Sequence, residues 1–281
     1  MAPFSSIVVC TLDRERWLRR ALRAIRRLRG ASFETIVVVG PTRDGSRELA
    51  RRSGTRVVDY SERNLSGARN AGVGAARGEI VAFLDDDSVP VRDWLVRLLP
   101  AFDSPDVVAA GGPVLDWRDP GLALPLSVSP FGVPSPGNGP ARRAPYLTGG
   151  NMAFPRARLL EAGGFDENYP FHLEDADLCL RLQDRGRLVF CQGAIVLQDF
   201  EGSAAHRGPE VVIRSASYFA FRHARGIRRL LLPVVPLFHA LVRLRRSPAG
   251  AGLPRHALRC LRGAALGFAS AFASPRLPLA T

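Results

Sequence analysis

The chain has 281 residues, enough for one large domain or two closely packed ones, and its hydrophobic fraction of 46% excludes a disordered protein. The formal net charge of +13 comes from 39 basic residues, all of them Arg, against 26 acids. Residues 1–203 carry a net charge of only +1, whereas residues 204–281, with 13 Arg and one acid, carry +12. The basic C-terminal segment therefore favours an anionic partner, either a membrane surface or a nucleic acid.

The four cysteines are scattered, with no CxxC pair and no His at metal-binding spacing, which indicates buried free thiols and a reducing compartment. We expect no secretory signal, because the apolar run at 7–10 is too short for one. The apolar stretch 230–242 contains two Pro and would span about 20 Å as a helix, short of the roughly 30 Å of a bilayer core. The stretch 263–273 is shorter still, so neither is expected to cross a membrane.

Short apolar runs alternate along the chain with segments of helical periodicity. Strands are expected at 6–10, 35–39, 56–58, 80–84, 107–110 and 188–191. Helices are expected at 18–28, 46–53, 66–77, 156–162 and 175–185. This alternation predicts an α/β fold with a doubly wound, mainly parallel sheet flanked by helices. The Pro- and Gly-rich segment 119–145 is predicted to be a mobile loop.

Three consecutive acids, Asp85, Asp86 and Asp87, follow the expected buried strand 80–84. In open α/β sheets, ligands bind in the crevice beyond the carboxyl ends of the strands. Crowded carboxylates repel one another, and Mg²⁺ or Mn²⁺ is typically held by one or two carboxylates together with substrate phosphates. Taken alone, the same run could also be a solvated acidic turn before the next helix.

Further polar clusters lie before and after these acids. Arg69, on the preceding helix, could pair with a phosphate or with the acids themselves. The turn containing Gly149 would let the backbone approach a ligand closely. An acidic cluster at 174–177 opens a helix, where acids also serve as caps, so capping and catalysis are both open for it.

Taken in order, these segments resemble the family 2 glycosyltransferases, inverting enzymes of the GT-A fold, over residues 5–200. The blocks that carry the resemblance are SIVVCTLDR (6–14), ETIVVVGPTRDGS (34–46), NLSGARNAG (64–72), GEIVAFLDDD (78–87), GGNMAF (149–154), GGFDE (163–167) and EDADL (174–178). The resemblance implies a nucleotide-sugar-binding half at 1–110 and an acceptor-binding, catalytic half at 111–203. Residues 204–281 would form a basic, partly helical C-terminal extension.

The resemblance also implies roles for single residues. The nucleotide sugar would be contacted by Thr11, Asp13, Arg14, Asp44, Arg69, Asp85 and Asp86. Asp85 and Asp87 would form the DxD pair that holds Mn²⁺ or Mg²⁺. Asp175 would be the catalytic base with Glu174 beside it, and the acceptor side would include Gly150, Asn151 and Asp177.

The chain departs from the family pattern at three places. Val39 and Gly40 stand where relatives usually have an acid that reads the nucleobase, so the donor's base and sugar stay open. Gln198 stands where many relatives have a His, which leaves His206 as the nearest substitute for a third metal ligand. The QxxRW signature of processive synthases is absent, which favours transfer of a single sugar.

The function implied is metal-dependent, inverting transfer of a sugar from a nucleotide-diphosphate donor to a hydroxyl of a glycan or a lipid-linked acceptor, in cell-envelope or polysaccharide synthesis. The loop 119–145 is expected to close over the donor and exclude water. We expect a cytoplasmic protein bound peripherally at the anionic inner membrane face through its basic extension, and no nucleic-acid partner. The alternative is a non-catalytic scaffold of the same fold that binds nucleic acid or membrane through the Arg-rich segment.

Overall fold

The computed structural model describes most of the chain in several stretches. These are residues 3–121, 123–124, 127–129, 134–135, 146–200, 208–223, 234–235, 237–239, 241 and 253–272. His206 and most of the predicted loop at 119–145 therefore lie outside the described residues.

A seven-stranded sheet forms the centre of the molecule, in the strand order β11-β6-β10-β4-β1-β2-β3. Its strands in chain order are β1 (Ser5–Thr11), β2 (Phe33–Val39), β3 (Arg56–Asp59), β4 (Ile80–Asp85), β6 (Val107–Gly111), β10 (Met152–Pro155) and β11 (Arg187–Phe190). All pairings are parallel except those of β10, which runs antiparallel to both β4 and β6. The predicted α/β class with a mainly parallel sheet is confirmed, whereas β10 was not predicted.

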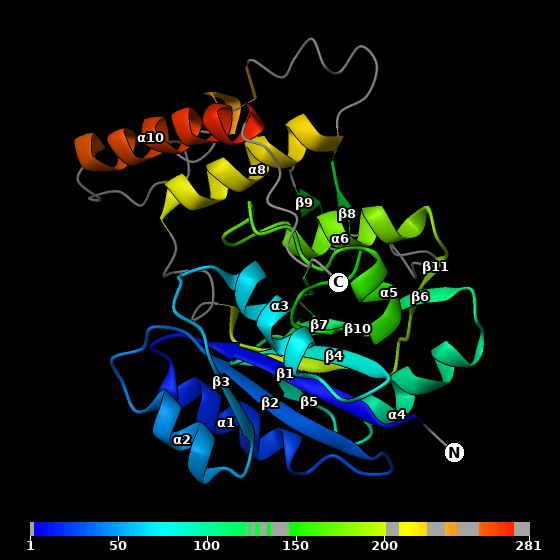
Figure 1. Cartoon of the computed structure of the whole chain (residues 1–281). Helices are drawn as coiled ribbons and strands as arrows, with labels where there is room; N and C mark the ends of the chain where they lie inside the picture. Colours follow the sequence, from blue (N-terminus) through cyan, green and yellow to red (C-terminus); the bar gives the residue numbers. More distant parts are fainter. Residues whose placement is uncertain are drawn as a thin grey trace.

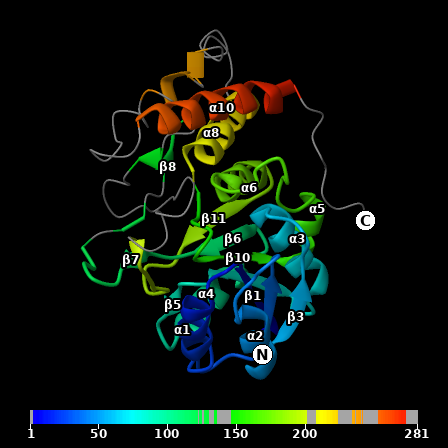
Figure 2. The same cartoon turned by 90° about the vertical axis from the view of Figure 1, so that its left-hand side faces the viewer.

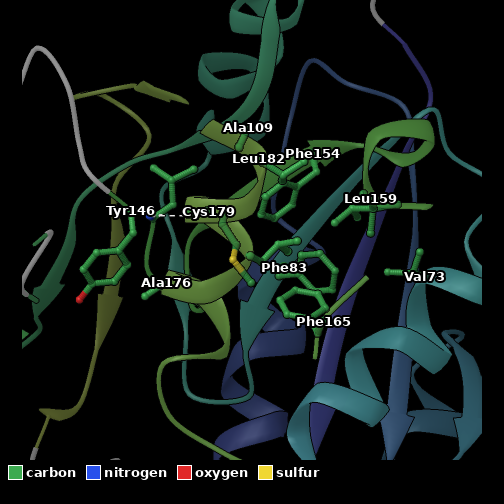
Figure 3. Close-up of a cluster of buried hydrophobic side chains, with 14 of the residues drawn as sticks. Val73, Phe83, Ala109, Tyr146, Phe154, Leu159, Phe165, Ala176, Cys179 and Leu182 are labelled. Carbon is green, nitrogen blue, oxygen red and sulfur yellow. Dashed lines mark hydrogen bonds between the residues drawn. The ribbon is translucent and has the colours of Figure 1, made fainter. Parts of the chain in front are cut away.

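Helices cover both faces of this sheet (Figures 1 and 2). One layer contains α1 (Glu15–Ile25), α2 (Ser46–Arg52), α4 (Trp94–Leu98) and a 3-10 helix (Leu99–Asp103); the other contains α3 (Leu65–Ala75), α5 (Arg156–Glu161) and α6 (Glu174–Gln183). Strand alternation divides the core accordingly, because Ile7 and Val9 join one buried cluster and Val8 the other. In the second cluster, shown in Figure 3, the ring of Phe83 lies edge-on to Phe165 with 5.2 Å between ring centroids.

Short strands extend this architecture beyond the main sheet. A three-stranded sheet has the order β5-β12-β7, formed by β5 (Val89–Pro90), β7 (Val114–Asp116) and β12 (Val196–Gln198). A two-stranded pair joins β8 (Ser127–Val128) to β9 (Pro134–Ser135). Strands of two or three residues show no measurable periodicity, which is why the sequence did not predict them.

Beyond residue 204, the described residues include the helices α8 (Pro209–His223) and α10 (Leu253–Phe272). Helix α8 packs on the main domain, since Ala216 and Phe219 belong to the same buried cluster as Phe83. Helix α10 lies against α8 on the side away from the sheet (Figures 1 and 2). Among the described residues, no helix is long and apolar enough to span a bilayer. All four cysteines are free thiols, as predicted, but only Cys179 and Cys260 are buried, while Cys10 and Cys191 are partly exposed.

Candidate active site

A cleft of about 600 Å³ opens at the carboxyl ends of β1 and β4. Parallel strands bring their carboxyl ends to one edge, so residues far apart in the sequence meet there. The lining includes six predicted site residues from the first half of the chain, two further charged residues and one residue of α8: Thr11, Asp13, Arg14, Asp85, Asp86, Asp87, Glu62, Arg63 and Val211. Glu62 and Arg63 were not predicted, and their only signal is a charged pair just before the NLSGARNAG block.

Two of the three acids share the guanidinium of Arg14. Arg14 donates from Nε to Asp86 Oδ1 at 2.8 Å and from Nη2 to Asp87 Oδ2 at 2.6 Å. The Thr11 hydroxyl donates to the other oxygen of Asp86 at 2.8 Å. Burial raises the pKa of Asp86 to about 6, and burial together with the charges of Asp85 and Asp86 raises the pKa of Asp87 to about 7. Thr11 and Arg14 thus line the cleft while they hold the acids in place; nucleotide contacts by either remain predictions.

Asp85 is the acid most open to the cleft. Its side chain is 38% exposed, against 10% for Asp86 and 3% for Asp87. Oδ1 accepts from Arg69 Nη2 at 3.3 Å, and Oδ2 accepts from the side-chain amide of Gln198 at 3.0 Å. Asp85 is therefore held from two sides and still presents oxygen to a ligand.

Arg69 connects this acid to the second acidic cluster. Its buried guanidinium donates from Nη1 to Glu174 Oε1 at 2.6 Å, so one side chain contacts both Asp85 and Glu174. Burial lowers the pKa of Arg69, but the charges of Glu174 and Asp85 raise it more, so its cation is stabilised. The other oxygen of Glu174 is buried and has no hydrogen-bond partner among the described groups.

Asp175 is positioned by backbone groups. Its Oδ2 accepts from Gly149 N at 2.8 Å, and its Oδ1 accepts from Ala176 N at 2.8 Å. Burial, followed by the charge of Glu174, raises its pKa to about 7. The N-cap of α6 is Leu173, which makes no side-chain capping bond, but Asp175 accepts from Ala176 N within the first turn, so the cluster has a capping contact and its catalytic role stays a prediction.

The Gly149–Gly150 turn passes between the two acidic clusters. A Cβ on Gly150 would lie 2.5 Å from Gln198 Nε2 and 2.9 Å from Asp85 Oδ2. A Cβ on Gly149 would also overlap the Arg69 guanidinium, at 2.3 Å from Nη2. No side chain fits at either position without moving these groups, and the close approach of this backbone to a ligand stays a prediction.

Two other residues predicted to contact the nucleotide sugar, Asp44 and Asp13, accept hydrogen bonds from backbone groups of the protein. The carboxylate of Asp44 accepts from Glu15 N at 2.7 Å and Ser46 N at 2.9 Å, so it ties the starts of α1 and α2 together. Burial raises its pKa, but the bonds from Ser46 and Glu15 lower it further, to about 2. Asp13, with φ +56°, does line the cleft, although its Oδ1 accepts from Arg43 N at 2.6 Å. Asp44 thus has a structural role at two helix starts, and nucleotide contacts by Asp44 and Asp13 stay predictions.

Two predicted acceptor-side residues are likewise structural. Asn151 is fully buried, accepts from Trp94 Nε1 at 2.8 Å and donates to the carbonyl oxygens of Pro113 and Ala194. Asp177 is also fully buried. Its carboxylate is bound by Arg181, Arg222 and His223. Both predictions are corrected, because these polar groups are already paired inside the protein.

The carboxylates of the cleft fit a hard divalent cation. Asp85 and Asp87 supply only oxygen ligands, and Asp85 is open to the cleft, which suits an ion whose remaining ligands come from a substrate diphosphate. Within the described stretches, no group of three or more His, Cys, Asp or Glu side chains is arranged as a complete metal site. The predicted ligand His206 is not among those residues.

The open α/β sheet with acids at the carboxyl end of a central strand defines a GT-A-type domain. The profile of glycosyl transferase family 2 matches residues 6–157, more than half of the chain, and the protein belongs to this family.

Curated relatives support the same assignment. The glucosyl-dolichyl phosphate glucuronosyltransferase of Haloferax volcanii is 28% identical over 202 residues, covering 64% of this chain and 63% of that protein. The pre-mycofactocin glycosyltransferase of Mycobacterium tuberculosis is 32% identical over 151 residues, 47% of this chain and 29% of that protein. The chain therefore spans less than two thirds of the length of these relatives.

Solved structures share the fold. Mannosyltransferase PcManGT from Pyrobaculum calidifontis, in complex with GDP-Man and Mn²⁺, has a TM-score of 0.63 at 16% identity, over 95% of this chain and 88% of that chain. GalNAc-T7 with UDP, GalNAc and Mn²⁺ has a TM-score of 0.65 at 13% identity, over 93% of this chain and 54% of that chain. At these identities the likeness establishes the GT-A fold.

Proposed function

We propose that this protein is a metal-dependent, inverting glycosyltransferase that moves one sugar from a nucleotide-diphosphate donor to an acceptor hydroxyl. The observation that carries the proposal is the connection between the two acidic clusters. Asp85, open to the cleft, is linked through the buried Arg69 to Glu174, next to Asp175. An acid for the donor and a candidate base for the acceptor are thereby fixed relative to each other.

The nucleotide diphosphate would lie in the cleft at the end of β4. Asp85 and Asp87 would hold Mn²⁺ or Mg²⁺, as oxygen ligands that leave room for phosphate. When bound, such a cation neutralises the charge that develops on a leaving diphosphate. Two of the structural neighbours were solved with Mn²⁺, which supports this assignment. Arg14 would keep Asp86 and Asp87 in position throughout.

Asp175 would accept the proton of the attacking hydroxyl. A general base works best when its pKa lies near the working pH, and the pKa of Asp175 is raised to about 7. The backbone bonds from Gly149 and Ala176 fix the direction of its carboxylate. The unpartnered oxygen of Glu174 lies one residue away and would accept a hydrogen bond from the acceptor or from water.

The acceptor would be a hydroxyl of a glycan or of a lipid-linked sugar, in envelope or polysaccharide synthesis. The name of the Haloferax volcanii relative includes a dolichyl phosphate sugar, which supports a lipid-linked class. The absence of the QxxRW signature supports transfer of one sugar at a time.

The test is a panel of GDP-, UDP- and dTDP-sugars incubated with the purified protein, with nucleotide release followed in Mn²⁺, in Mg²⁺ and in chelator. We expect release from one donor class that requires metal, and a product whose anomeric configuration, read by NMR, is opposite to that of the donor. Metal-independent release would contradict the cation assignment, and a retained configuration would contradict inversion. Absence of binding and of release with every donor would favour the non-catalytic scaffold.

A further inference from the structure

The exposed large apolar side chains of this protein are concentrated on its C-terminal helices. Among the described residues, ten such side chains are exposed, and three of them, Phe4, Val96 and Trp117, are scattered over the main domain. The other seven all fall between residues 234 and 266: Val234, Leu237, Phe238, Leu241, Leu258, Leu261 and Leu266. We call these seven the apolar face.

The first part of the apolar face has helical spacing. Val234, Leu237, Phe238 and Leu241 stand at i, i+3, i+4 and i+7, and each is 49–60% exposed. Val235, between them, is 4% exposed and packs with Ala220 of α8. The segment thus has an inner side against α8 and an outer apolar stripe directed away from it.

Helix α10 repeats this arrangement. Its inner side is made of small residues, and a Cβ on Gly263 or Gly267 would lie 2.6 Å from Glu210 Cα or 2.5 Å from Ser217 Cβ, so the helix sits close against α8. On the outer side Leu258 is 68% exposed and Leu261 55%. Both views show α8 between α10 and the sheet, so this outer side faces away from the main domain (Figures 1 and 2).

The charge of the region complements an anionic surface. Residues 204–281 carry a net +12, and Arg262 is exposed next to Leu261. Exposed apolar side chains in a strongly basic region match a bilayer interface, where the chains enter the acyl boundary and each Arg near the anionic headgroups strengthens binding about fivefold. A second copy of this strongly basic region would instead bring like charges together.

We propose that the apolar face docks on an anionic lipid bilayer and holds the enzyme at the membrane without spanning it. Val211, near the start of α8, lines the donor cleft, so docking through helices packed on α8 keeps the cleft near the bilayer surface. Given the proposed transferase function, on which this inference rests, the acceptor is a lipid-linked molecule presented at that surface.

The test is flotation of the full-length protein with vesicles of phosphatidylcholine, and with vesicles of phosphatidylcholine and phosphatidylglycerol in equal parts. We expect binding to the anionic vesicles only, weakened by high salt. The double variant Leu258→Glu/Leu261→Glu should weaken binding at least about tenfold, because two apolar contacts are lost. The matched double variant Phe4→Glu/Val96→Glu, with the same change in charge at exposed positions elsewhere, should bind within about twofold of wild type.

Several results would overturn the proposal. These are equal binding to both kinds of vesicle, binding to neither, or an equal loss in both double variants. Conversion of a dimer to a monomer by the α10 variant, seen by light scattering, without vesicle binding by wild type would assign the face to a second copy. Phe238→Glu tests the other stripe if the α10 variant unfolds. Donor binding by calorimetry should be unchanged in every variant; its absence in wild type would refute the transferase function and leave the membrane result standing.

Discussion

Asp175→Asn separates the catalytic contribution of this carboxylate from its structural one. A pKa raised from 3.8 to about 7 means that the fold disfavours the ionised carboxyl by on the order of 4 kcal/mol. Because the folded pKa lies above the unfolded one, the folded state binds more protons between about pH 4 and pH 7, and stability falls as pH rises through that window. Asn carries no charge at any pH, so the variant lacks the destabilisation that ionisation of the buried carboxyl causes above pH 7.

The substitution also has a structural cost. The two carboxylate oxygens accept from Gly149 N and Ala176 N, and an amide can keep only one of these bonds, a loss of about 1 kcal/mol. At pH 8 the variant should therefore be more stable than wild type by up to about 3 kcal/mol, from the difference of the two terms. At pH 5 the folded carboxyl keeps its proton while the unfolded one is mostly ionised, so the advantage should shrink to under about 1 kcal/mol.

Activity should change in the opposite direction. An amide cannot accept the acceptor's proton, and loss of a positioned general base costs about 10²–10⁴-fold in rate. We expect urea unfolding at pH 8 and pH 5 to show the stability pattern, calorimetry to show retained donor binding, and nucleotide release to fall at least a hundredfold. In wild type, kcat/KM should decline below about pH 7.

Glu174→Gln is the control, and its effect on rate should be milder. If Asp175→Asn turns over like wild type while Glu174→Gln is inactive, the two roles are exchanged. If both variants are active, the base lies elsewhere. A variant at Asp175 that is markedly less stable at pH 8 would refute the argument from desolvation.

Three further substitutions test the rest of the site. Asp87→Ala should abolish transfer and weaken Mn²⁺ binding in a calorimetric titration, without loss of thermal stability, because burial and acidic neighbours raise the pKa of the removed carboxyl to about 7. Gly149→Ala should displace Arg69 and lower kcat/KM at least tenfold, whereas Gly74→Ala, in open space on α3, should raise stability by about 1 kcal/mol; equal effects would contradict the packing argument. Asp177→Asn should destabilise the fold by about 3–5 kcal/mol in urea unfolding, since it removes the charge of a fully buried carboxylate that binds Arg181, Arg222 and His223, and a loss under about 1 kcal/mol would refute that reasoning.

The contribution of Asp177 to the stability of the fold changes with pH in the opposite direction to that of Asp175. Burial raises its pKa, but the hydrogen bond from His223 and the charges of Arg181 and Arg222 lower it further, below the ordinary 3.8. Its stabilising contribution is therefore present above about pH 4 and is lost as the pH falls further.

Helices that bury one face along several turns, and apolar strands in the βα alternation, could be predicted from the sequence. The strand expected at 80–84 is Ile80–Asp85 in the structure, and the helix expected at 66–77 is Leu65–Ala75. Strand β10 was not predicted because its antiparallel place between β4 and β6 depends on contacts distant in sequence.

The active site, too, could be predicted from the sequence only in part. The sequence placed the acids at the end of a strand, because strand ends and ligand crevices coincide in this class of fold. It could not show that Arg14 pairs with Asp86 and Asp87, or that Asn151 is enclosed by buried backbone carbonyls. A side chain's partner is decided by tertiary packing, and a motif position alone does not distinguish a group facing ligand from one facing the core.

Strand β4 is hydrogen-bonded on both sides, to β1 and to β10, so the strand that ends in Asp85 has no free edge. Its amide protons should exchange with solvent only when the whole sheet opens, on the slowest timescale of the molecule. Helix α10 packs mainly on α8 and should exchange through local opening, many times faster. The position of the acid in the cleft therefore lasts as long as the folded state itself, while the helix beyond it can leave and return many times within that lifetime.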